Sequence, residues 1–440
     1  MSDNLQRVNE SVLEIRPKKP TKARYGILML LFIGTAINYM DRTNISVAAP
    51  EIQKYFHLNP TMLGLIFSAF AWSYAIGQIP GGWVLDRFGP KRTYGTALSL
   101  WSVFTFLQGV AHGFGFLFVM RLGMGLTESP AFPTNNKVVT SWFPQKERAF
   151  ATGVYTAGEF VGLAFLTPFL FWLLSSFGWR SIFFVTGVIG LLYAFVWVKR
   201  YCDPKESKTI NQAELEYIQE GGGLTENTRQ GNKINWHQAR ELFKHRQFWG
   251  LYIGQFGVTS TLYFFLTWFP TYLITEKHMT ILKAGFFASV PYIAAFIGVL
   301  CGGFWSDWML KRGKKVGIAR KTPIVLGLLF SCCIILANYT SSVGLIILIM
   351  SIAFFGQGMS GISWSLVSEI APAKLVGLAG GVFNFAGNLS GIVTPLLIGF
   401  IVSATNSFSG ALLVVGGFAL MGALSYIFLL GKVKRIEIDS

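Results

Sequence analysis

Five ionisable side chains lie inside apolar stretches of this sequence that are long enough to cross a bilayer. They are Asp41 and Arg42 in NYMDRTN, Arg121 and Glu128 in MRLGMGLTESP, and Glu159 in YTAGEFVG. A charge at membrane depth costs about 2.5–3.5 kcal/mol on insertion scales, so such a residue usually faces a partner or a water-filled cavity and has a function. Two basic groups can hold an anion, and acidic groups can carry protons. This combination is the minimum chemistry of a proton-coupled carrier of organic anions.

The two arginines are the candidate ligands of a carboxylate. A guanidinium stays charged and binds a carboxylate through two parallel hydrogen bonds. Arg121 and Glu128 are two helical turns apart, about 10 Å on an ideal helix, which is too far for a direct pair. Pro130 and Pro133 follow in the sequence, and they predict a kink just beyond Glu128. The alternative is that each arginine only neutralises a neighbouring acid.

Asp41 precedes Arg42 directly, so their side chains point about 100° apart around the first helix. We therefore expect Asp41 to face a different partner from Arg42. A carboxylic acid in a low-dielectric site prefers its neutral form, and a nearby arginine favours the charged form. An acid under both influences can bind a proton in one state of a carrier and release it in another. A fixed salt bridge is the alternative for Asp41 and for Glu128.

The composition predicts the elements that position these residues. Apolar residues make up 52% of the 440, and only 13% are charged, whereas soluble domains carry about 25% charged residues. Apolar runs of this length predict membrane-spanning helices, about twelve in all, and not the strands of a barrel. We place them at residues 25–49, 62–85, 93–113, 114–135, 150–177, 181–198, 248–273, 284–310, 323–339, 343–367, 376–402 and 409–431.

The net charge of +16 follows from the predicted topology. Most of the 37 Lys and Arg fall in the N-terminal tail, the even-numbered loops and the C-terminal tail, whereas Lys54, Arg180, Lys277 and Lys283 fall in loops on the other side. By the positive-inside rule both termini are predicted to be cytoplasmic. The charge therefore does not indicate a nucleic-acid partner.

Histidines and cysteines form no catalytic or metal-binding pattern. Four of the five histidines fall in predicted loops, His112 lies at the very end of the predicted span 93–113, and the four cysteines have no ligand spacing. We therefore expect a protein that is not an enzyme and that has no cofactor and no metal.

Two fragments of the sequence recur about half a chain length apart. GGWVLDRFGPKR reappears as GGFWSDWMLKRG, and FPQKERAFATG is matched by APAKLVGLAGG. The pattern predicts two similar bundles of six helices in parallel orientation. The N-terminal tail and bundle occupy residues 1–198, a polar linker occupies 199–246, and the C-terminal bundle and tail occupy 247–440. Within the linker, INQAELEYIQEG is predicted to be an amphipathic helix at the membrane interface.

The chain resembles the major facilitator superfamily over its whole length. The loop signature G-x-x-x-D-R-x-G-x-K-R is present as Gly82, Asp86, Arg87, Gly89, Lys91 and Arg92. Within that superfamily the chain is similar to the anion:cation symporters that carry D-galactonate, glucarate, galactarate and hexuronates. The strings that carry this similarity are NYMDRTNISVA, FSAFAWSYAIGQIPGGW, ESPAFPTNN, SWFPQKERA, TWFPTYL, ARKTPI and GGVFNFAGN.

The resemblance implies an all-α membrane protein of twelve transmembrane helices in two pseudo-symmetric bundles, in the inner membrane of a bacterial cell. It implies a monomer that imports a sugar-acid anion together with protons by alternating access. Asp41 and Glu128 match the protonation sites of the resembled symporters. The substrate contacts that the resemblance implies are Tyr39, Arg42, Tyr74, Ser363, Trp364 and Asn384, to which the carboxylate argument adds Arg121.

Glu159 departs from the pattern, because the galactonate-type carriers have glutamine at the matching position. A carboxylate there can add a titrating group, or it can form hydrogen bonds with sugar hydroxyls as a further substrate contact. An interfacial acid that pairs with Arg121 or snorkels to water is the alternative. The resemblance also implies a cytoplasmic gate whose charges latch the two bundles in one state and release them in the other, formed by Asp86, Arg87, Arg92, Asp307 and Arg320.

Three other functions are compatible with parts of these observations. The first is an exchanger or uniporter for a hexuronate or another carboxylate, with the same fold. The second is a membrane sensor that signals through the linker, although the linker has no recognisable output domain. The third is a channel, which two similar halves and a gate disfavour.

Overall fold

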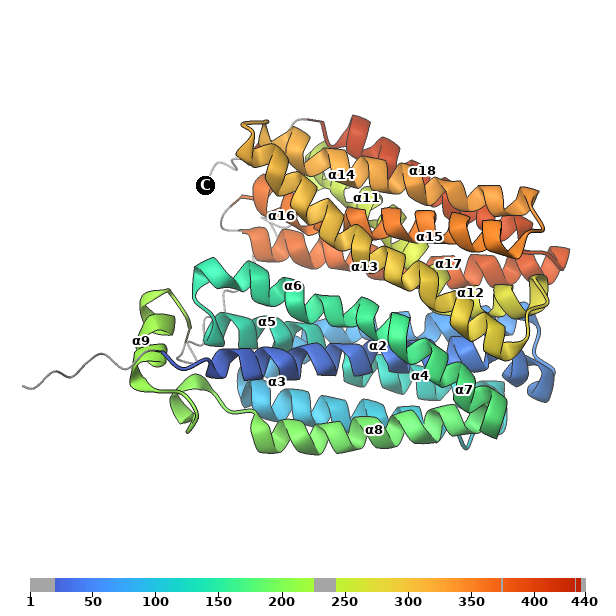
Figure 1. Ribbon diagram of the computed structural model, residues 1–440, viewed down its shortest axis with the longest axis horizontal. Helices are drawn as coiled ribbons and strands as arrows, with labels where there is room; N and C mark the ends of the chain where they lie inside the picture. The colour runs from blue at the N-terminus through green and yellow to red at the C-terminus, as the bar shows by residue number, and fades with distance from the viewer. Residues whose placement is uncertain (1–19, 225–242, 373–374, 432, 437–440) are drawn as a thin grey trace, which may run out of the picture.

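The computed structural model describes residues 20–224, 243–372, 375–431 and 433–436 of the chain. Within these residues the protein is built from helices, and nine helical stretches are long and apolar enough to cross a membrane. They form two groups that lie side by side in Figure 1. Helices α2 to α8 form the group that we call the N-terminal half, and α11 to α18 form the C-terminal half.

The N-terminal half begins with two long helices. The first is α2 (Ala23–Phe56), and the second is α3 (Pro60–Gln108), which contains Gly89 at φ +75°. This left-handed conformation suits glycine, and it bends α3 into two legs. The remaining elements are α4 (Phe114–Glu128), α5 (Ala131–Trp142), α6 (Gln145–Val161), the π-helical turn η1 (Gly162–Leu166), α7 (Thr167–Phe177) and α8 (Trp179–Arg200).

The C-terminal half repeats this plan with more interruptions. Its elements are α11 (Arg246–Thr267), α12 (Phe269–Thr271), η3 (Tyr272–Glu276), α13 (Ile281–Lys311), α14 (Val316–Cys332), η4 (Cys333–Tyr339), α15 (Val343–Met359), η5 (Ser360–Ile362), α16 (Ser363–Ile370), α17 (Val376–Thr405), α18 (Ser409–Leu424) and η7 (Ser425–Leu429).

The prediction of twelve spans agrees with this arrangement. Helix α3 is counted as one of the nine stretches. Its two legs on either side of Gly89 correspond to two of the predicted spans, 62–85 and 93–113. The broken pair α4–α5 and the run α11–α12–η3 are the other crossings that the nine do not include. The all-α membrane fold predicted from the sequence is therefore confirmed.

The kink predicted beyond Glu128 is also present. Helix α4 ends at Glu128, and α5 begins at Ala131 after Ser129 and Pro130. Proline has no amide hydrogen to donate to the preceding turn. The break therefore positions Glu128 at a helix end, deep inside the N-terminal half.

The two halves pack tightly at one end of the molecule, which we call the far end. A Cβ atom on Gly64 of α3 would lie 2.7 Å from the carbonyl oxygen of Pro395 in α17, and one on Gly399 would lie 2.6 Å from that of Pro60. Phe67 packs edge to face on Trp268, with ring centroids 5.1 Å apart. Figure 1 shows the halves converging at this end, where α7 also contacts α13.

The opposite end, which we call the linker end, carries helix α9 (Gln212–Glu220) and the last described C-terminal residues. Here Gly82, Gly153, Gly303 and Gly381 have no atom within 4 Å of the position of an added Cβ. The two halves are thus closed against each other at the far end, whereas these four glycines of the linker end have open space beside them.

The helix predicted in the linker is present as α9, and it packs against protein, while its location at a membrane interface stays a prediction. Glu214 is fully buried, and its carboxylate accepts hydrogen bonds from Thr21 Oγ1 (2.6 Å), Arg24 Nη1 (2.8 Å) and the amides of Ala23 and Arg24. These amides are free donors at the start of α2, so Glu214 caps that helix. The linker residues 225–242 lie outside the described residues.

A second set of contacts joins α9 to α6. Tyr217 donates a 2.6 Å hydrogen bond to Glu147, which also pairs with Arg24, and this hydrogen bond raises the pKa of Tyr217. The amide of Gln145 donates to the carbonyl of Gly221 at 2.8 Å. Residues 199–224 of the linker therefore belong to the N-terminal half, and α9 fixes the ends of α2 and α6 to each other.

Candidate functional site

Arg42 and Glu128 form a buried ion pair in the middle of the N-terminal half. Arg42 Nε donates to Glu128 Oε1 at 2.6 Å, and Nη2 lies 2.5 Å from the same oxygen. The side chain of Glu128 is fully buried, and that of Arg42 is 9% exposed. The other carboxylate oxygen, Oε2, has no hydrogen-bond partner among the described residues. The pair joins α2 to the end of α4, where the break after Glu128 brings the two helices together.

Three aromatic rings surround the guanidinium of Arg42. Its Cζ atom lies 4.8 Å from the ring centroids of Tyr39 and Phe70 and 4.9 Å from that of Tyr74. Tyr39 precedes Arg42 by one turn of α2, and Phe70 and Tyr74 stack on each other one turn apart on α3. Aromatic faces attract a cation most strongly where water is excluded. The predicted contacts Tyr39, Arg42 and Tyr74 are therefore brought together.

Arg121 lies inside the N-terminal half and makes no ion pair within the described part of the chain. Its Cζ atom is 5.2 Å from the centroid of Phe70, the ring that also contacts Arg42, and Nη1 lies 3.5 Å from Met124 Sδ. Thr105 and Gln108 of α3 approach the same sulfur. The side chain is 2% exposed, and Nε has no partner among the described residues. Its role as a substrate contact stays a prediction.

Asp41 faces away from Arg42, as its place on the helix predicts. Its carboxylate accepts hydrogen bonds from Trp101 Nε1 at 3.2 Å and Asn44 Nδ2 at 3.3 Å. Asn44 also donates to Thr186 of α8 at 2.7 Å. The residue is 1% exposed, and no cation of the described residues pairs with it. Asp41 is therefore a buried acid that only neutral groups contact directly.

Glu159 lies beside Tyr39, on the face of α6 that meets α2. Gly158 and Gly162 permit this contact, because a Cβ atom on either would lie 2.5–2.6 Å from a carbonyl oxygen of α2. Glu159 is 7% exposed, and it interacts with the Tyr39 hydroxyl and the charge of Arg42. The π-helical turn η1 begins three residues later, and such turns often occur at functional sites. No pair with Arg121 forms within the described residues.

Neutral polar residues of the C-terminal half reach this cluster at Asn384 and Tyr263. Asn384 of α17 donates a 2.9 Å hydrogen bond to Gln78 of α3, and this bond joins the two halves. Gln78 lies one helical turn after Tyr74. Ser363 donates to Gln255 of α11 at 3.0 Å. Tyr263 donates to Asn388 at 3.4 Å and lies within electrostatic range of Arg42 and Glu128. We call Gln255, Tyr263, Ser363, Asn384 and Asn388 the amide wall.

Trp364 is the predicted contact that lies apart from the others. It packs edge to face on Phe383, with centroids 4.9 Å apart, and it is 48% exposed. Its neighbour Ser363 points into the amide wall instead, because consecutive residues of a helix point about 100° apart. A contact between Trp364 and a substrate therefore stays a prediction.

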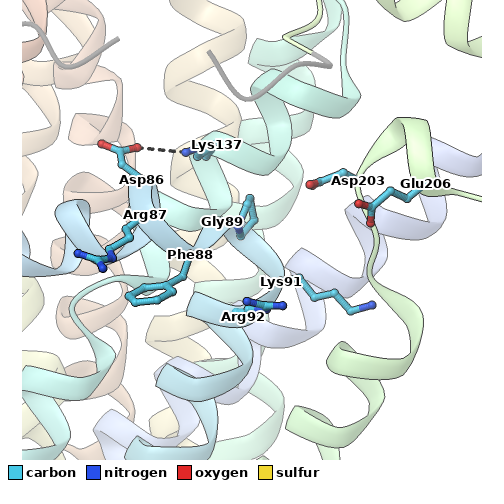
Figure 2. A pocket seen from close by; sticks show the side chains of 10 residues that line it. Asp86, Arg87, Phe88, Gly89, Lys91, Arg92, Lys137, Asp203 and Glu206 are labelled. Atoms are coloured by element: carbon cyan, nitrogen blue, oxygen red, sulfur yellow. Dashed lines mark hydrogen bonds and ion pairs between the residues drawn. The ribbon is translucent and has the colours of Figure 1, made fainter. Parts of the chain in front are cut away.

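The predicted gate residues lie at the linker end, and each ion pair there stays within one half. Asp86 Oδ1 lies 3.1 Å from Lys137 Nζ of α5, and Asp307 Oδ1 lies 3.0 Å from Arg320 Nη1 of α14. The guanidinium of Arg87 lies over the ring of Trp83. Figure 2 shows Asp86, Arg87, Lys91 and Arg92 around a cavity of about 370 Å³, with Asp203 and Glu206 of the linker on its other side.

Several polar residues at the site were not predicted from the sequence. Gln78, Gln255, Tyr263 and Asn388 complete the surface between the halves, and Asn38 lies one turn before Arg42 with both amide atoms unpartnered among the described residues. An amide within an apolar span is the signal that could have identified the three residues Asn38, Gln78 and Gln255. Tyr263 gives no such signal in a chain rich in aromatic residues.

Known proteins are similar to this chain over most of its length. The family model described as Major Facilitator Superfamily matches residues 31–395. The D-galactonate transporter of Escherichia coli O6:H1 is 49% identical over 432 residues, which cover 96% of this chain and 99% of that protein. The "Probable galactarate/D-glucarate transporter" of Escherichia coli K12 is 45% identical, with 96% of both chains covered.

A solved structure supports the fold. The bacterial homologue of the human lysosomal transporter Spinster, in an inward-facing and unoccupied conformation, superposes with a TM-score of 0.68 at 21% sequence identity. The match covers 93% of this chain and 95% of that chain.

Proposed function

The chain belongs to the major facilitator superfamily, and we propose that it is a proton-coupled symporter that imports a sugar-acid anion, a hexonate or a hexarate, by alternating access. The family and these relatives make it a membrane transporter and not an enzyme. We place it in the inner membrane of a bacterium as a monomer, with the linker end and both termini in the cytoplasm.

The observation that carries this proposal is the Arg42–Glu128 pair within its aromatic surround. Nε and Nη2 of Arg42 both approach a single oxygen of Glu128. A carboxylate of a substrate can replace Glu128 and bind the guanidinium through two oxygens. Protonation of Glu128 removes its charge and frees Arg42 for the anion. Substrate and proton thus favour the same state of the site, which is the requirement for coupling.

Asp41 supplies a second proton-binding group in the same half. It is buried among neutral donors from α3 and α8, so a change in how these helices pack alters how well the charged form is solvated. The protons that bind with the substrate offset its negative charge. Uptake then need not work against a membrane potential that is negative inside.

The remaining residues orient and release the substrate. Tyr39, Tyr74 and the amide wall offer hydroxyl and amide groups to the sugar hydroxyls. With the far end closed and open space beside the four glycines of the linker end, the substrate would leave toward the cytoplasm. In this state each gate pair stays within its own half. We propose that some of these charges pair across the halves when the linker end closes.

Uptake into proteoliposomes tests the proposal. Labelled galactonate, glucarate and glucuronate are offered with an imposed inward proton gradient, with and without a protonophore. Gradient-dependent accumulation of one of them is the expected result. Acceleration by internal anion without any gradient effect would instead make the protein an exchanger and reduce Asp41 and Glu128 to structural charges. Downhill flux that neither condition changes would make it a uniporter.

A further inference from the structure

The charges inside the membrane region are distributed unequally between the two halves. Asp41, Arg42, Arg121, Glu128 and Glu159 all belong to the N-terminal half. In the C-terminal half the sequence has no Asp, Glu, Lys, Arg or His at residues 247–275, 284–306, 322–368 and 375–431. A ligand held between the halves therefore meets charged groups on one side and neutral groups on the other.

The neutral side is the amide wall. Its members are two asparagines, a glutamine, a serine and a tyrosine, and each can both donate and accept a hydrogen bond. Several already bond to one another, as in Ser363 to Gln255 at 3.0 Å and Tyr263 to Asn388 at 3.4 Å. Such groups satisfy alcohol hydroxyls. They do not neutralise a carboxylate, which is costly to bury without a cation or a set of donors directed at it.

Arg42 is the arginine that adjoins the amide wall. It contacts Tyr74, one turn from Gln78, and Gln78 bonds across the halves to Asn384. Arg121, by contrast, packs on Phe70 and Met124 within the N-terminal half. Both arginines thus lie on the side of the N-terminal half, and the apolar spans of the C-terminal half offer no cation to the other end of an elongated ligand.

Glu159 adds an acidic side chain at the meeting point of the halves. Its neighbour Phe160 packs on Phe354 of α15, with ring centroids 6.2 Å apart, and Glu159 itself lies beside Tyr39. An ionised carboxylate accepts hydrogen bonds from hydroxyls and repels another carboxylate. This residue therefore favours a ligand whose uncharged part passes close to it.

On the premise of the proposed sugar-acid transport, we propose that the site selects polyhydroxy monocarboxylates over the dicarboxylates of the same hydroxyl configuration, with Glu159 as the residue that discriminates. The carboxylate binds toward Arg42, and the hydroxylated chain lies against the amide wall and Glu159. A second carboxylate at the far end of the ligand meets either neutral amides or the charge of Glu159. Discrimination comes from repulsion as well as from attraction.

Galactonate and galactarate provide the matched pair for a test, since they differ only in a terminal hydroxymethyl or carboxylate group. Both are added as unlabelled competitors to uptake of labelled galactonate by proteoliposomes at about pH 7, where both carboxyl types are ionised. We expect galactarate to compete at least about tenfold less well than galactonate. Equal competition by the two acids would overturn the inference.

Two substitutions test the assigned cause. Glu159→Gln removes the repelling charge and should bring the two acids within about threefold of each other, whereas Asn384→Lys supplies a cation in the amide wall and should favour galactarate. An unchanged ratio in Glu159→Gln would exclude Glu159 as the discriminating residue. Size-exclusion profiles of both variants check that they fold.

Ligand-dependent thermal stabilisation of the purified protein separates this inference from the proposed function. If galactonate stabilises the protein more than galactarate but no proton gradient drives uptake, the selectivity stands and proton coupling fails. If galactarate stabilises the protein as well as galactonate, the selectivity fails whatever the coupling. If neither acid binds, both proposals fail.

Discussion

Arg42 holds Glu128 through one carboxylate oxygen, with Nε at 2.6 Å and Nη2 at 2.5 Å from Oε1, while Oε2 has no hydrogen-bond partner among the described residues. A pair of this kind leaves the acid only partly satisfied. Burial of a charged pair gives little net stability, because the desolvation cost offsets most of the attraction. The arrangement is therefore suited to being broken by a proton and rebuilt around another carboxylate.

Glu128→Gln should separate transport from proton coupling. Glutamine keeps the shape of the side chain but cannot lose or gain a proton, so Arg42 stays available to the anion in every state. Stimulation by an inward proton gradient should fall by about 5- to 150-fold, because typical coupling free energies between two sites correspond to factors of this size. Exchange of labelled for unlabelled substrate across the membrane should persist. Full gradient-driven accumulation in this variant would remove Glu128 from the coupling mechanism.

Arg42→Lys should weaken substrate binding although it keeps the positive charge. A lysine ammonium cannot form two parallel hydrogen bonds to a carboxylate or lie flat among three rings. Loss of one charge-assisted hydrogen bond, worth about 1.5–3 kcal/mol, corresponds to about a 10- to 150-fold rise in the concentration for half-maximal uptake. Lys137→Arg, at the linker end, is the matched exchange away from the site. A similar effect of the two substitutions would argue against a direct role for Arg42.

Trp101→Phe should change the pH dependence of transport and leave substrate affinity near its original value. The substitution removes the indole donor of the 3.2 Å hydrogen bond to Asp41, which stabilises the charged carboxylate. Asp41 should therefore hold its proton to higher pH, and the decline of uptake with rising pH should shift upward. Uptake measured across a pH series, alone and combined with Asp41→Asn, checks this. The shift should disappear in the double variant, and its persistence there would mean that another group is responsible.

Gly64→Ala should favour opening at the far end. The added Cβ would lie 2.7 Å from the carbonyl oxygen of Pro395 in the other half, and overpacking of this kind costs about 1–3 kcal/mol. Reactivity of a cysteine introduced at Gln53 toward a membrane-impermeant reagent should rise. Gly344→Ala is the control, because no atom lies within 4 Å of its added Cβ. Equal reactivity in both variants would show that the far-end contact does not limit opening.

Glu214→Gln should lower the stability of the protein more than Glu220→Gln. Glu214 is fully buried and accepts hydrogen bonds from Thr21, Arg24 and the first amides of α2, whereas Glu220 lies on the exposed side of the same helix. The loss of charge-assisted hydrogen bonds is worth about 1.5–3 kcal/mol. The apparent melting temperature of the detergent-purified protein measures the difference. Equal melting temperatures would mean that α9 does not stabilise α2.

Much of the architecture could be predicted from the sequence, because lipid leaves few choices to the backbone. Long apolar runs must form helices there, since each buried amide needs an internal partner. The bend at Gly89 and the break after Glu128 were also accessible, from a glycine in the loop signature and from Pro130. The helix in the linker could be predicted from its amphipathic pattern, but that pattern does not reveal that the start of α2 donates hydrogen bonds to Glu214.

For the site, the sequence by itself determined which charges lie at membrane depth, because an ionisable residue stands out in an apolar span. Only the tertiary structure decided how they are paired. Arg42 forms an ion pair with Glu128 of α4, and Asp41 accepts a hydrogen bond from Trp101. Arg121 contacts Met124 within the N-terminal half. These contacts join residues distant in sequence, and they depend on the crossing of helices at close-packed glycines and on the break of α4. No local spacing encodes that geometry.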